Sequence, residues 1–209
     1  MTRHKELTAK GQATRRRIVE GAAEVLREQG VNTVTLDDVM ARTRTSKSQL
    51  FHYFPDGKDE LLLAVAEFEA DQVIEDQQPY LGRLDSWESW QRWRDVVVAR
   101  YEIQGDTCPL GSLFLQVGRA TPGARAIVTG LMRRWQQSLA AGIRALRAAE
   151  GPSAEFDVDA RAAALLAAIQ GGVSILMSTG DSTHLRAALD QGLADLRRDL
   201  MPAGSVAPR

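Results

Sequence analysis

Thr35-Leu-Asp-Asp-Val-Met-Ala-Arg-Thr-Arg-Thr-Ser46-Lys-Ser-Gln-Leu-Phe-His-Tyr-Phe54 decides the fold of this 209-residue chain. Its first part predicts a short helix, because Thr35 is a good N-cap and Asp38 completes an acidic form of the capping box. A tight turn at residues 44–45 leads into a second short helix that is rich in hydrogen-bonding side chains. Two short helices joined by a few residues, the second one polar, are typical of a helix-turn-helix, whose second helix enters the DNA major groove.

The residues before this stretch predict a third helix and a basic arm. Apolar side chains recur there at spacings of three and four, as on one face of a helix, at Ile18, Ala22, Val25 and Leu26. Gly30 ends that helix, because glycine tolerates the left-handed conformation. Residues 13–57 therefore predict a three-helix DNA-binding domain. Residues 1–12 predict a flexible arm, and its excess of Lys and Arg suits either phosphate binding or a solvated tail.

Several motifs together resemble the N-terminal domain of the TetR family of transcriptional regulators. They are Thr14-Arg-Arg-Arg-Ile18, Gly30, Ser46-Lys47 followed by Leu50-Phe51-His52-Tyr53-Phe54, and Lys58-Asp-Glu-Leu61. Two further segments are similar to the LmrA/YxaF-like branch of that family, namely Phe54-Pro-Asp-Gly-Lys58 and Cys108-Pro-Leu-Gly-Ser-Leu113. The chain departs from the family at Phe51, where a tyrosine usually reaches a phosphate, and in the turn before Lys58, which is one residue longer.

The resemblance implies an all-α transcriptional regulator with an N-terminal DNA-binding domain and a larger C-terminal domain for ligand binding and dimerisation. Such a protein binds double-stranded operator DNA with pseudo-palindromic sequence as a homodimer. A small molecule in the C-terminal domain changes the spacing of the two DNA-binding heads, and the repressor then releases its operator. These properties are expectations that the resemblance implies.

The 100° step of a helix divides the second helix of the motif into two faces. Leu50 and Phe54 lie on the face that we expect in the core. The opposite face consists of Ser48 and His52, flanked by Gln49 and Phe51. A glutamine can form two hydrogen bonds with an adenine, a serine can reach several base edges, and a phenylalanine can press against a thymine methyl.

Other positions predict contacts with the DNA backbone, and some have a structural alternative. The flexible point charge of Lys47 suits a phosphate, and Lys58 adds positive charge near the start of the next helix. Ser46 and Gln49 also fit a capping box, and the hydroxyl of Thr35 suits either a cap or a phosphate. The resemblance implies a backbone contact at Tyr53. The predicted DNA-binding residues are Thr35, Ser46, Lys47, Ser48, Gln49, Phe51, His52, Tyr53 and Lys58.

Beyond Lys58 the helical pattern continues almost to the end of the chain. Caps, prolines and apolar spacings predict helices over residues 58–77, 86–104, 109–119, 122–150, 157–180 and 182–200. The sequence contains no alternating strand pattern, so we expect an all-α fold of about nine helices. Residues 58–200 predict the ligand-binding and dimerisation domain, and residues 201–209 predict a tail.

Large, soft or aromatic side chains in this domain are candidates for a pocket that takes a small apolar or aromatic effector. Two polar residues are added because they interrupt inward-facing helices and can fix a polar group. The alternative for each candidate is core packing. The candidates are Trp87, Trp90, Trp93, Arg100, Tyr101, Phe114, Gln116, Met132, Trp135 and Met177. We expect Cys108 to be a small buried residue. The alternative is a redox-sensing role, which would lack a second cysteine to resolve the oxidised form.

The last two helices predict a dimer interface. The first is rich in small residues, at Ala160, Ala164, Ala167, Ala168, Gly171, Gly172 and Ser174. The second carries a leucine stripe, at Leu185, Leu189, Leu193 and Leu196. Small side chains permit close approach of helices, so two such helices from each subunit predict a four-helix interface, which the resemblance also implies. The alternative is that the small residues pack within one subunit.

Composition limits other classes of function. The net charge is −1, 44% of the residues are hydrophobic, and we expect no apolar run that approaches the roughly 20 residues of a membrane span. A polar N-terminus and a single cysteine suit a cytoplasmic protein. The three histidines are widely separated, and no glycine-rich phosphate loop follows a strand, so we expect no enzyme, metal or cofactor. The competing class is a helical small-molecule-binding protein that does not bind regulatory DNA.

Overall fold

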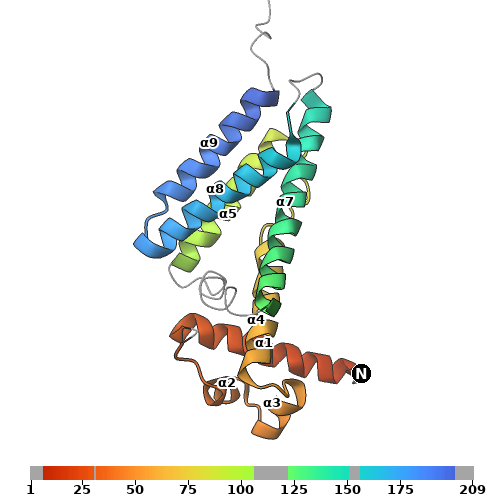
Figure 1. Ribbon diagram of the computed structural model, residues 1–209, viewed down its shortest axis with the longest axis vertical. Helices are drawn as coiled ribbons and strands as arrows, with labels where there is room; N and C mark the ends of the chain where they lie inside the picture. Colours follow the sequence, from red (N-terminus) through yellow and green to blue (C-terminus); the bar gives the residue numbers. More distant parts are fainter. Residues whose placement is uncertain (1–6, 31, 106–121, 151–155, 201–209) are drawn as a thin grey trace, which may run out of the picture. The chain divides into compact units, whose positions relative to one another are not determined.

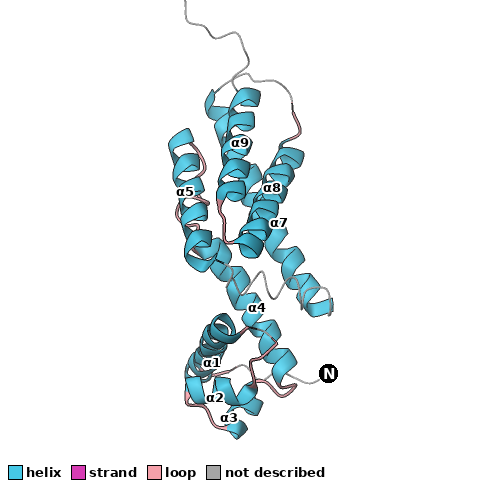
Figure 2. Ribbon diagram, turned by 90° about the vertical axis from the view of Figure 1, so that its left-hand side faces the viewer, coloured by secondary structure: helices cyan, strands magenta, loops and turns pink. Residues whose placement is uncertain are grey.

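The computed structural model describes residues 7–30, 32–105, 122–150 and 156–200. These residues form eight α-helices and no strand (Figures 1 and 2), which confirms the all-α class. The helices are α1 (Ala9–Gln29), α2 (Leu36–Thr43), α3 (Lys47–Tyr53), α4 (Lys58–Glu75), α5 (Trp87–Gln104), α7 (Pro122–Glu150), α8 (Val158–Thr179) and α9 (Thr183–Leu200). The helix predicted over residues 109–119 and the tail predicted over residues 201–209 lie outside the described residues.

The chain divides into two compact units, and within the described residues the boundaries fall inside α4 and α7. The first unit contains the chain up to Asp71 and the start of α7 as far as Ile127, and the second unit contains the rest. The first unit therefore extends beyond the domain boundary predicted after residue 57. The reason is that Leu61 and Val65 of α4 are buried in the same apolar core as α1, α2 and α3.

Helix α1 begins at Ala9, earlier than the sequence pattern predicts. Thr8 is its N-cap, and the Thr8 hydroxyl accepts a hydrogen bond at 3.2 Å from the backbone N–H three residues later. Residues 9–12 are therefore helical, and the flexible arm predicted over residues 1–12 is wrong for them. The helix ends as predicted at Gly30, whose φ of 81° is a conformation that favours glycine.

The contact between α1 and α2 depends on a second glycine. A methyl group at Gly21 would lie 2.3 Å from the Cγ2 atom of Thr43, so α2 passes too close to α1 for a side chain at this position. Around this contact the first unit has one apolar core. Its buried members include Ile18, Ala22, Val39, Leu50, Phe54 and Val65. The helix-turn-helix is therefore held against α1 by close packing.

In the second unit, α8 and α9 run side by side (Figure 1). Gly172 permits this approach, because a methyl group there would lie 2.5 Å from the Cα atom of Leu185. Gly192 of α9 is equally close to Leu165, whose Cδ1 atom would lie 2.5 Å from an added methyl group. The predicted leucine stripe of α9 is buried at Leu185, Leu189 and Leu196, whereas Leu193 is half-buried.

Helix α8 is apolar on more than its packed face. Its mean hydropathy reaches 1.6 over 18 residues, so by length and composition alone it is long enough to cross a membrane, although a buried core helix passes the same test. The expectation that no apolar run approaches this length is therefore wrong. Only 39% of that window is buried, and the exposed face carries Ala164, Ala167, Gly171, Ser174 and Ile175.

Candidate nucleic-acid interface

Helix α2 begins with the predicted capping box. The Thr35 hydroxyl accepts a hydrogen bond from the Asp38 N–H at 3.2 Å, and the Thr35 N–H donates to the Asp38 carboxylate at 2.9 Å. The Thr35 hydroxyl also donates to that carboxylate at 2.6 Å. These bonds stabilise the charged carboxylate and so lower the pKa of Asp38, the Thr35 hydroxyl more than the Thr35 N–H. The capping role of Thr35 is confirmed, and a phosphate contact by its hydroxyl stays a prediction.

The turn between α2 and α3 is compact and internally bonded. Arg44 adopts the left-handed conformation, with φ 50° and ψ 46°, and ends α2. The buried Thr43 hydroxyl donates to the Val39 carbonyl at 2.7 Å and lies 2.9 Å from the Thr45 hydroxyl. The Thr45 N–H donates to the Met40 carbonyl at 3.0 Å. Because these groups bond one another, the turn fixes the direction in which α3 leaves α2.

Helix α3 has the two faces that the sequence predicts. Leu50 is fully buried, and so is Phe54, which directly follows the helix. Ser48 and His52 are exposed on the other side. Phe51 beside them is 37% exposed, an unusual exposure for a large apolar side chain. One face of α3 is therefore fixed in the core of the first unit, and the other presents hydroxyl, imidazole and aromatic groups to solvent.

Ser46 and Gln49 form only half of a capping box. The Ser46 hydroxyl accepts a hydrogen bond from the Gln49 N–H at 3.2 Å and caps α3. Within the part of the chain that the structure describes, the Gln49 side chain makes no hydrogen bond back to Ser46. The cap therefore occupies Ser46, whereas the half-buried side-chain amide of Gln49 keeps its donor and acceptor atoms for another partner.

The residues predicted to contact the DNA backbone differ in exposure and in their contacts within the protein. Lys47 is exposed at the first position of α3. The half-buried Tyr53 ring meets His52 edge-on, with ring centroids 4.9 Å apart. Lys58 is half-buried, and its ammonium donates to the Val34 carbonyl at 2.6 Å. Lys58 therefore attaches the start of α4 to the loop before α2, and its two other N–H donors leave a phosphate contact as a prediction.

Arg44 is a candidate that the sequence pattern does not single out. It lies in the turn just before α3, is exposed, and has no ion pair with any residue that the structure describes. Only Thr45 and the N-cap Ser46 separate it from the first residue of α3. The signal that could have found it is a basic residue in the turn of a helix-turn-helix, where phosphate contacts orient the motif on DNA.

One ion-pair cluster joins α1 to α2, and a single ion pair joins α1 to α4. Arg42 of α2 bonds Glu24 at 3.2 Å and Glu28 at 2.5 Å, both on α1. The hydrogen bond from Arg42 lowers the pKa of Glu28. Arg27 of α1 bonds Glu69 of α4 at 2.6 Å, and only 2% of the Glu69 side chain is exposed. Helix α1 is thus bound by charge to α2 and to α4.

The predicted effector-binding residues of the second unit differ in burial and in hydrogen bonding. Trp90, Trp93, Tyr101 and Trp135 are buried. The Trp90 N–H donates to the Leu84 carbonyl at 3.0 Å, and the Trp93 N–H donates to the Gln77 side chain at 2.8 Å. These two indoles already have partners inside the protein, which favours the core-packing alternative for them. Among the described residues the buried Trp135 N–H has no hydrogen-bond partner.

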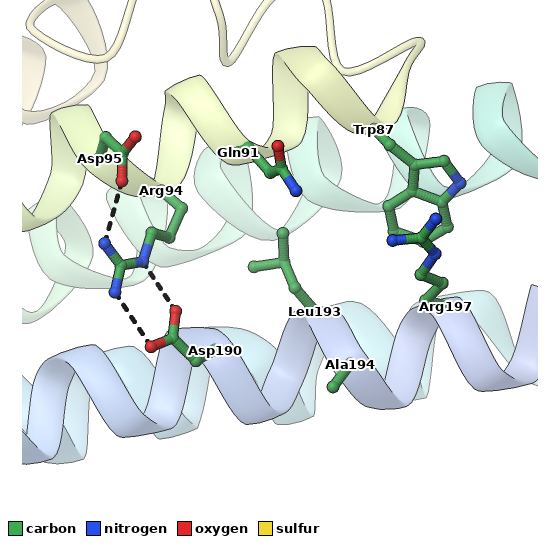
Figure 3. Close-up of a pocket in the computed structure, with 8 residues that line it drawn as sticks. All are labelled: Trp87, Gln91, Arg94, Asp95, Asp190, Leu193, Ala194 and Arg197. Atoms are coloured by element: carbon green, nitrogen blue, oxygen red, sulfur yellow. Dashed lines mark hydrogen bonds and ion pairs between the residues drawn. The ribbon is translucent and has the colours of Figure 1, made fainter.

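The remaining candidates have other surroundings. Arg100 pairs with Asp76 and donates to the Gln72 carbonyl at 3.4 Å, so it links α5 to α4. Met132 and Met177 are half-buried. Trp87 is also half-buried, and its ring is on the surface between α5 and α9 (Figure 3). Phe114, Gln116 and Cys108 lie outside the described residues.

Comparison with known proteins matches two segments of the chain. Residues 18–65 match the family described as bacterial regulatory proteins, TetR family. Residues 85–191 match the tetracyclin repressor-like C-terminal domain. The first match covers α2 and α3, and the second covers the helices from α5 into α9.

Individual proteins give the same result. The transcriptional regulator AcuR of Cereibacter sphaeroides is 25% identical over 162 residues, which are 75% of this chain and 73% of that protein. YxaF of Bacillus subtilis (strain 168), an uncharacterized HTH-type transcriptional regulator, is 22% identical over 191 residues, 88% of this chain and 95% of that protein, and gives loose support to the predicted branch.

The fold has close counterparts among solved structures. The crystal structure of a TetR transcriptional regulator from Chloroflexus aurantiacus J-10-FL has a TM-score of 0.73 at 21% identity, over 92% of this chain and 98% of that one. The exposed polar face of α3 thus lies within the segment that matches the TetR-family model, and the segment that matches the C-terminal domain follows it along the chain. The chain belongs to the TetR family and is a DNA-binding transcriptional regulator.

Proposed function

We propose that the protein is a repressor that binds a pseudo-palindromic operator as a homodimer and releases it when a small molecule binds the second unit. The observation that carries the proposal is the exposed polar face of α3, held by the buried Leu50 and Phe54. Two such helices in one dimer would read major grooves about 34–36 Å apart, or a multiple of that distance. A protein with this role works in the cytoplasm, where the chromosome is.

The contacts with DNA divide into two kinds. Ser48, Gln49 and His52 contact base edges, because their polar atoms are on the outward side of α3 and can match the pattern of donors and acceptors in the major groove. Phe51 contacts a thymine methyl with its exposed edge. Phosphates are contacted by the predicted residues Lys47, Tyr53 and Lys58, to which the position of Arg44 adds a fourth.

The homodimer forms through the outer faces of α8 and α9. Gly172 and Gly192 serve packing inside one subunit, whereas a methyl group at Gly171 would have no atom within 4 Å. Gly171 is in the exposed row with Ala164, Ala167 and Ile175. A helix that is apolar on both sides is normally buried on both sides, so a second copy of α8 and α9 is the natural cover. The small side chains permit that close approach.

The effector is a small apolar or aromatic molecule, and its site is in the second unit. Two observations support this part. The second unit is much larger than a DNA-binding head requires, and the buried Trp135 carries an N–H without a partner among the described residues. A buried polar group is normally hydrogen-bonded, so this N–H suits an acceptor atom on a ligand. The half-buried Met132 and Met177 are soft side chains of the kind that adapts to apolar molecules.

Fluorescence anisotropy with duplexes tiled across the DNA that flanks the protein's own gene tests the proposal. We expect one duplex to bind far more tightly than a scrambled duplex of equal length, and we expect a Ser48→Ala/His52→Ala variant with unchanged circular dichroism to lose that preference. If the wild type bound no duplex in preference to the scrambled one, the competing class would be favoured, a helical protein that binds small molecules without regulatory DNA binding.

A further inference from the structure

A groove runs between α5 and α9 on the surface of the second unit (Figure 3). Its volume is about 410 Å³, and its lining residues are Trp87, Gln91, Arg94, Asp95, Asp190, Leu193, Ala194 and Arg197. Sites for small organic ligands commonly have volumes of roughly 300–1,000 Å³. The size therefore suits a small molecule, and the chemistry of the two ends decides which kind.

At one end of the groove a single arginine is shared by two carboxylates. Arg94 donates to both carboxylate oxygens of Asp190, at 2.8 and 3.0 Å, and to Asp95 at 2.9 Å. The Arg94 side chain is only 19% exposed. Its fork of N–H donors is thus used to join α5 to α9. The three side chains together carry one net negative charge, so this end offers no free cation to an anionic ligand.

The other end carries a cation without an acidic partner. The Arg197 guanidinium lies over the Trp87 ring, 5.5 Å from its centroid. Among the described residues no carboxylate is within 4.0 Å of the Arg197 guanidinium, although the Trp87 N–H donates to Glu150 at 2.9 Å. The planar donor fork of Arg197 therefore remains for an anion, beside an aromatic face.

The middle of the groove is mixed. Figure 3 shows Leu193 of α9 and Gln91 of α5 pointing toward each other between the two ends. Leu193 is half-buried and gives an apolar floor next to the indole. In the part of the chain that the structure describes, the Gln91 amide makes no hydrogen bond. Together these groups provide an apolar surface, one amide and one cation within a single groove.

We propose that this groove binds a small planar aromatic carboxylate. The carboxylate pairs with Arg197 through two parallel hydrogen bonds, which is the geometry that a guanidinium favours. The aromatic ring packs on Leu193 and on the edge of Trp87, and the Gln91 amide accommodates a second polar substituent. This site is additional to the proposed regulatory function and does not depend on it, because binding is measured on the protein alone.

Indole NMR on the full-length protein tests the site directly. The chain has four tryptophans, and three of them are fully buried, so only Trp87 can meet a ligand in this groove. With ¹⁵N-labelled tryptophan and the Trp87→Phe variant to assign the signals, we expect 2-naphthoate to shift the Trp87 N–H signal and leave the other three in place. An unmoved Trp87 signal at saturating 2-naphthoate would overturn the proposal. It would mean either that the groove does not bind the ligand or that a second copy of the chain covers the groove.

Charge specificity provides the second test. Arg197→Gln should weaken 2-naphthoate binding by roughly tenfold or more in calorimetry, because it removes the two charged hydrogen bonds to the carboxylate. Neutral 2-naphthamide should bind the variant and the wild type alike. The matched control is Arg133→Gln, which removes an exposed arginine of α7 outside the groove and should leave both affinities unchanged. Equal weakening of both ligands by Arg197→Gln, or a loss caused by Arg133→Gln, would refute the assigned role of Arg197.

Discussion

The close contact between α1 and α2 can be tested by moving one methyl group from one helix to the other. In Gly21→Ala the new methyl group would lie 2.3 Å from the Thr43 Cγ2 atom, far inside the normal carbon separation of about 3.5–4.0 Å. Rotation of Thr43 cannot relieve the overlap cheaply, because the Thr43 hydroxyl donates to the Val39 carbonyl at 2.7 Å. The variant must therefore push α2 away from α1.

The expected free energies follow from this geometry. Overpacking costs about 1–3 kcal/mol, and the helix preference of alanine over glycine returns about 1 kcal/mol, so Gly21→Ala loses up to about 2 kcal/mol. Thr43→Ser keeps the hydroxyl and loses about 1 kcal/mol for one buried methyl group. In the double variant the nearest atoms are Arg42 Cγ at 3.5 Å and the Cβ of residue 43 at 3.7 Å, which are ordinary contacts. The double variant should therefore be more stable than either single variant.

Urea unfolding at one fixed protein concentration, followed by circular dichroism, measures all four proteins of this cycle. We expect a favourable coupling free energy of about 1–3 kcal/mol between the two substitutions. Operator affinity should follow the same order, because α2 carries the turn that directs α3. Additive effects of the two substitutions would refute the reasoning, since they would mean that the two methyl groups never compete for the same space.

Three further predictions concern DNA contacts, pH and control. Gln49→Ala should relax the preference at one base pair, at a cost of roughly 1–3 kcal/mol in binding free energy. Lys47→Gln should weaken binding to all sequences alike and reduce the slope of log affinity against log salt concentration by about one. Exchanged outcomes would reverse the two assignments. Because Arg42 lowers the pKa of Glu28, this carboxylate stabilises the fold above its ordinary pKa of 4.5 and ceases to do so as pH falls through the lowered value. Arg42→Gln should therefore flatten the acid limb of a curve of unfolding free energy against pH. An effector that releases DNA should bind more weakly when operator is present, by a coupling free energy of roughly 1–3 kcal/mol. Tryptophan-fluorescence titrations with and without operator measure the two affinities. Equal affinities would contradict allosteric control by that molecule.

The sequence predicted local features of the DNA-binding unit well, because they depend on neighbours along the chain. The buried and exposed faces of α3 follow from the helical step that separates Leu50 and Phe54 from Ser48 and His52. The capping box at Thr35 follows from a spacing of three residues. The start of α1 was missed because the residues that follow Thr8 are small or polar, and no apolar period continues back to it.

Features that depend on distant parts of the chain could not be predicted in the same way. The apolar face of α4 reads alike whichever core it enters, so the sequence did not indicate that Leu61 and Val65 belong to the first unit. The tryptophans of α5 recur every three residues, and a 100° step per residue turns Trp93 about 120° away from Trp87. This rotation leaves Trp87 on the groove between α5 and α9 and Trp93 in the core. Only the packing of α9 reveals which of the two tryptophans lies on the surface.

The attachment of α4 determines how the first unit can respond to force. Helix α4 is fixed at its first residue by the bond from Lys58 to the Val34 carbonyl and, 11 residues later, by the pair between Glu69 and Arg27. At 1.5 Å per residue these two fixing points are roughly 16 Å apart along the helix axis. A rod clamped at two points cannot pivot about either one. We therefore expect a torque on α4 to turn α1, α2 and α3 as one body, so that α3 would change its position without changing its shape.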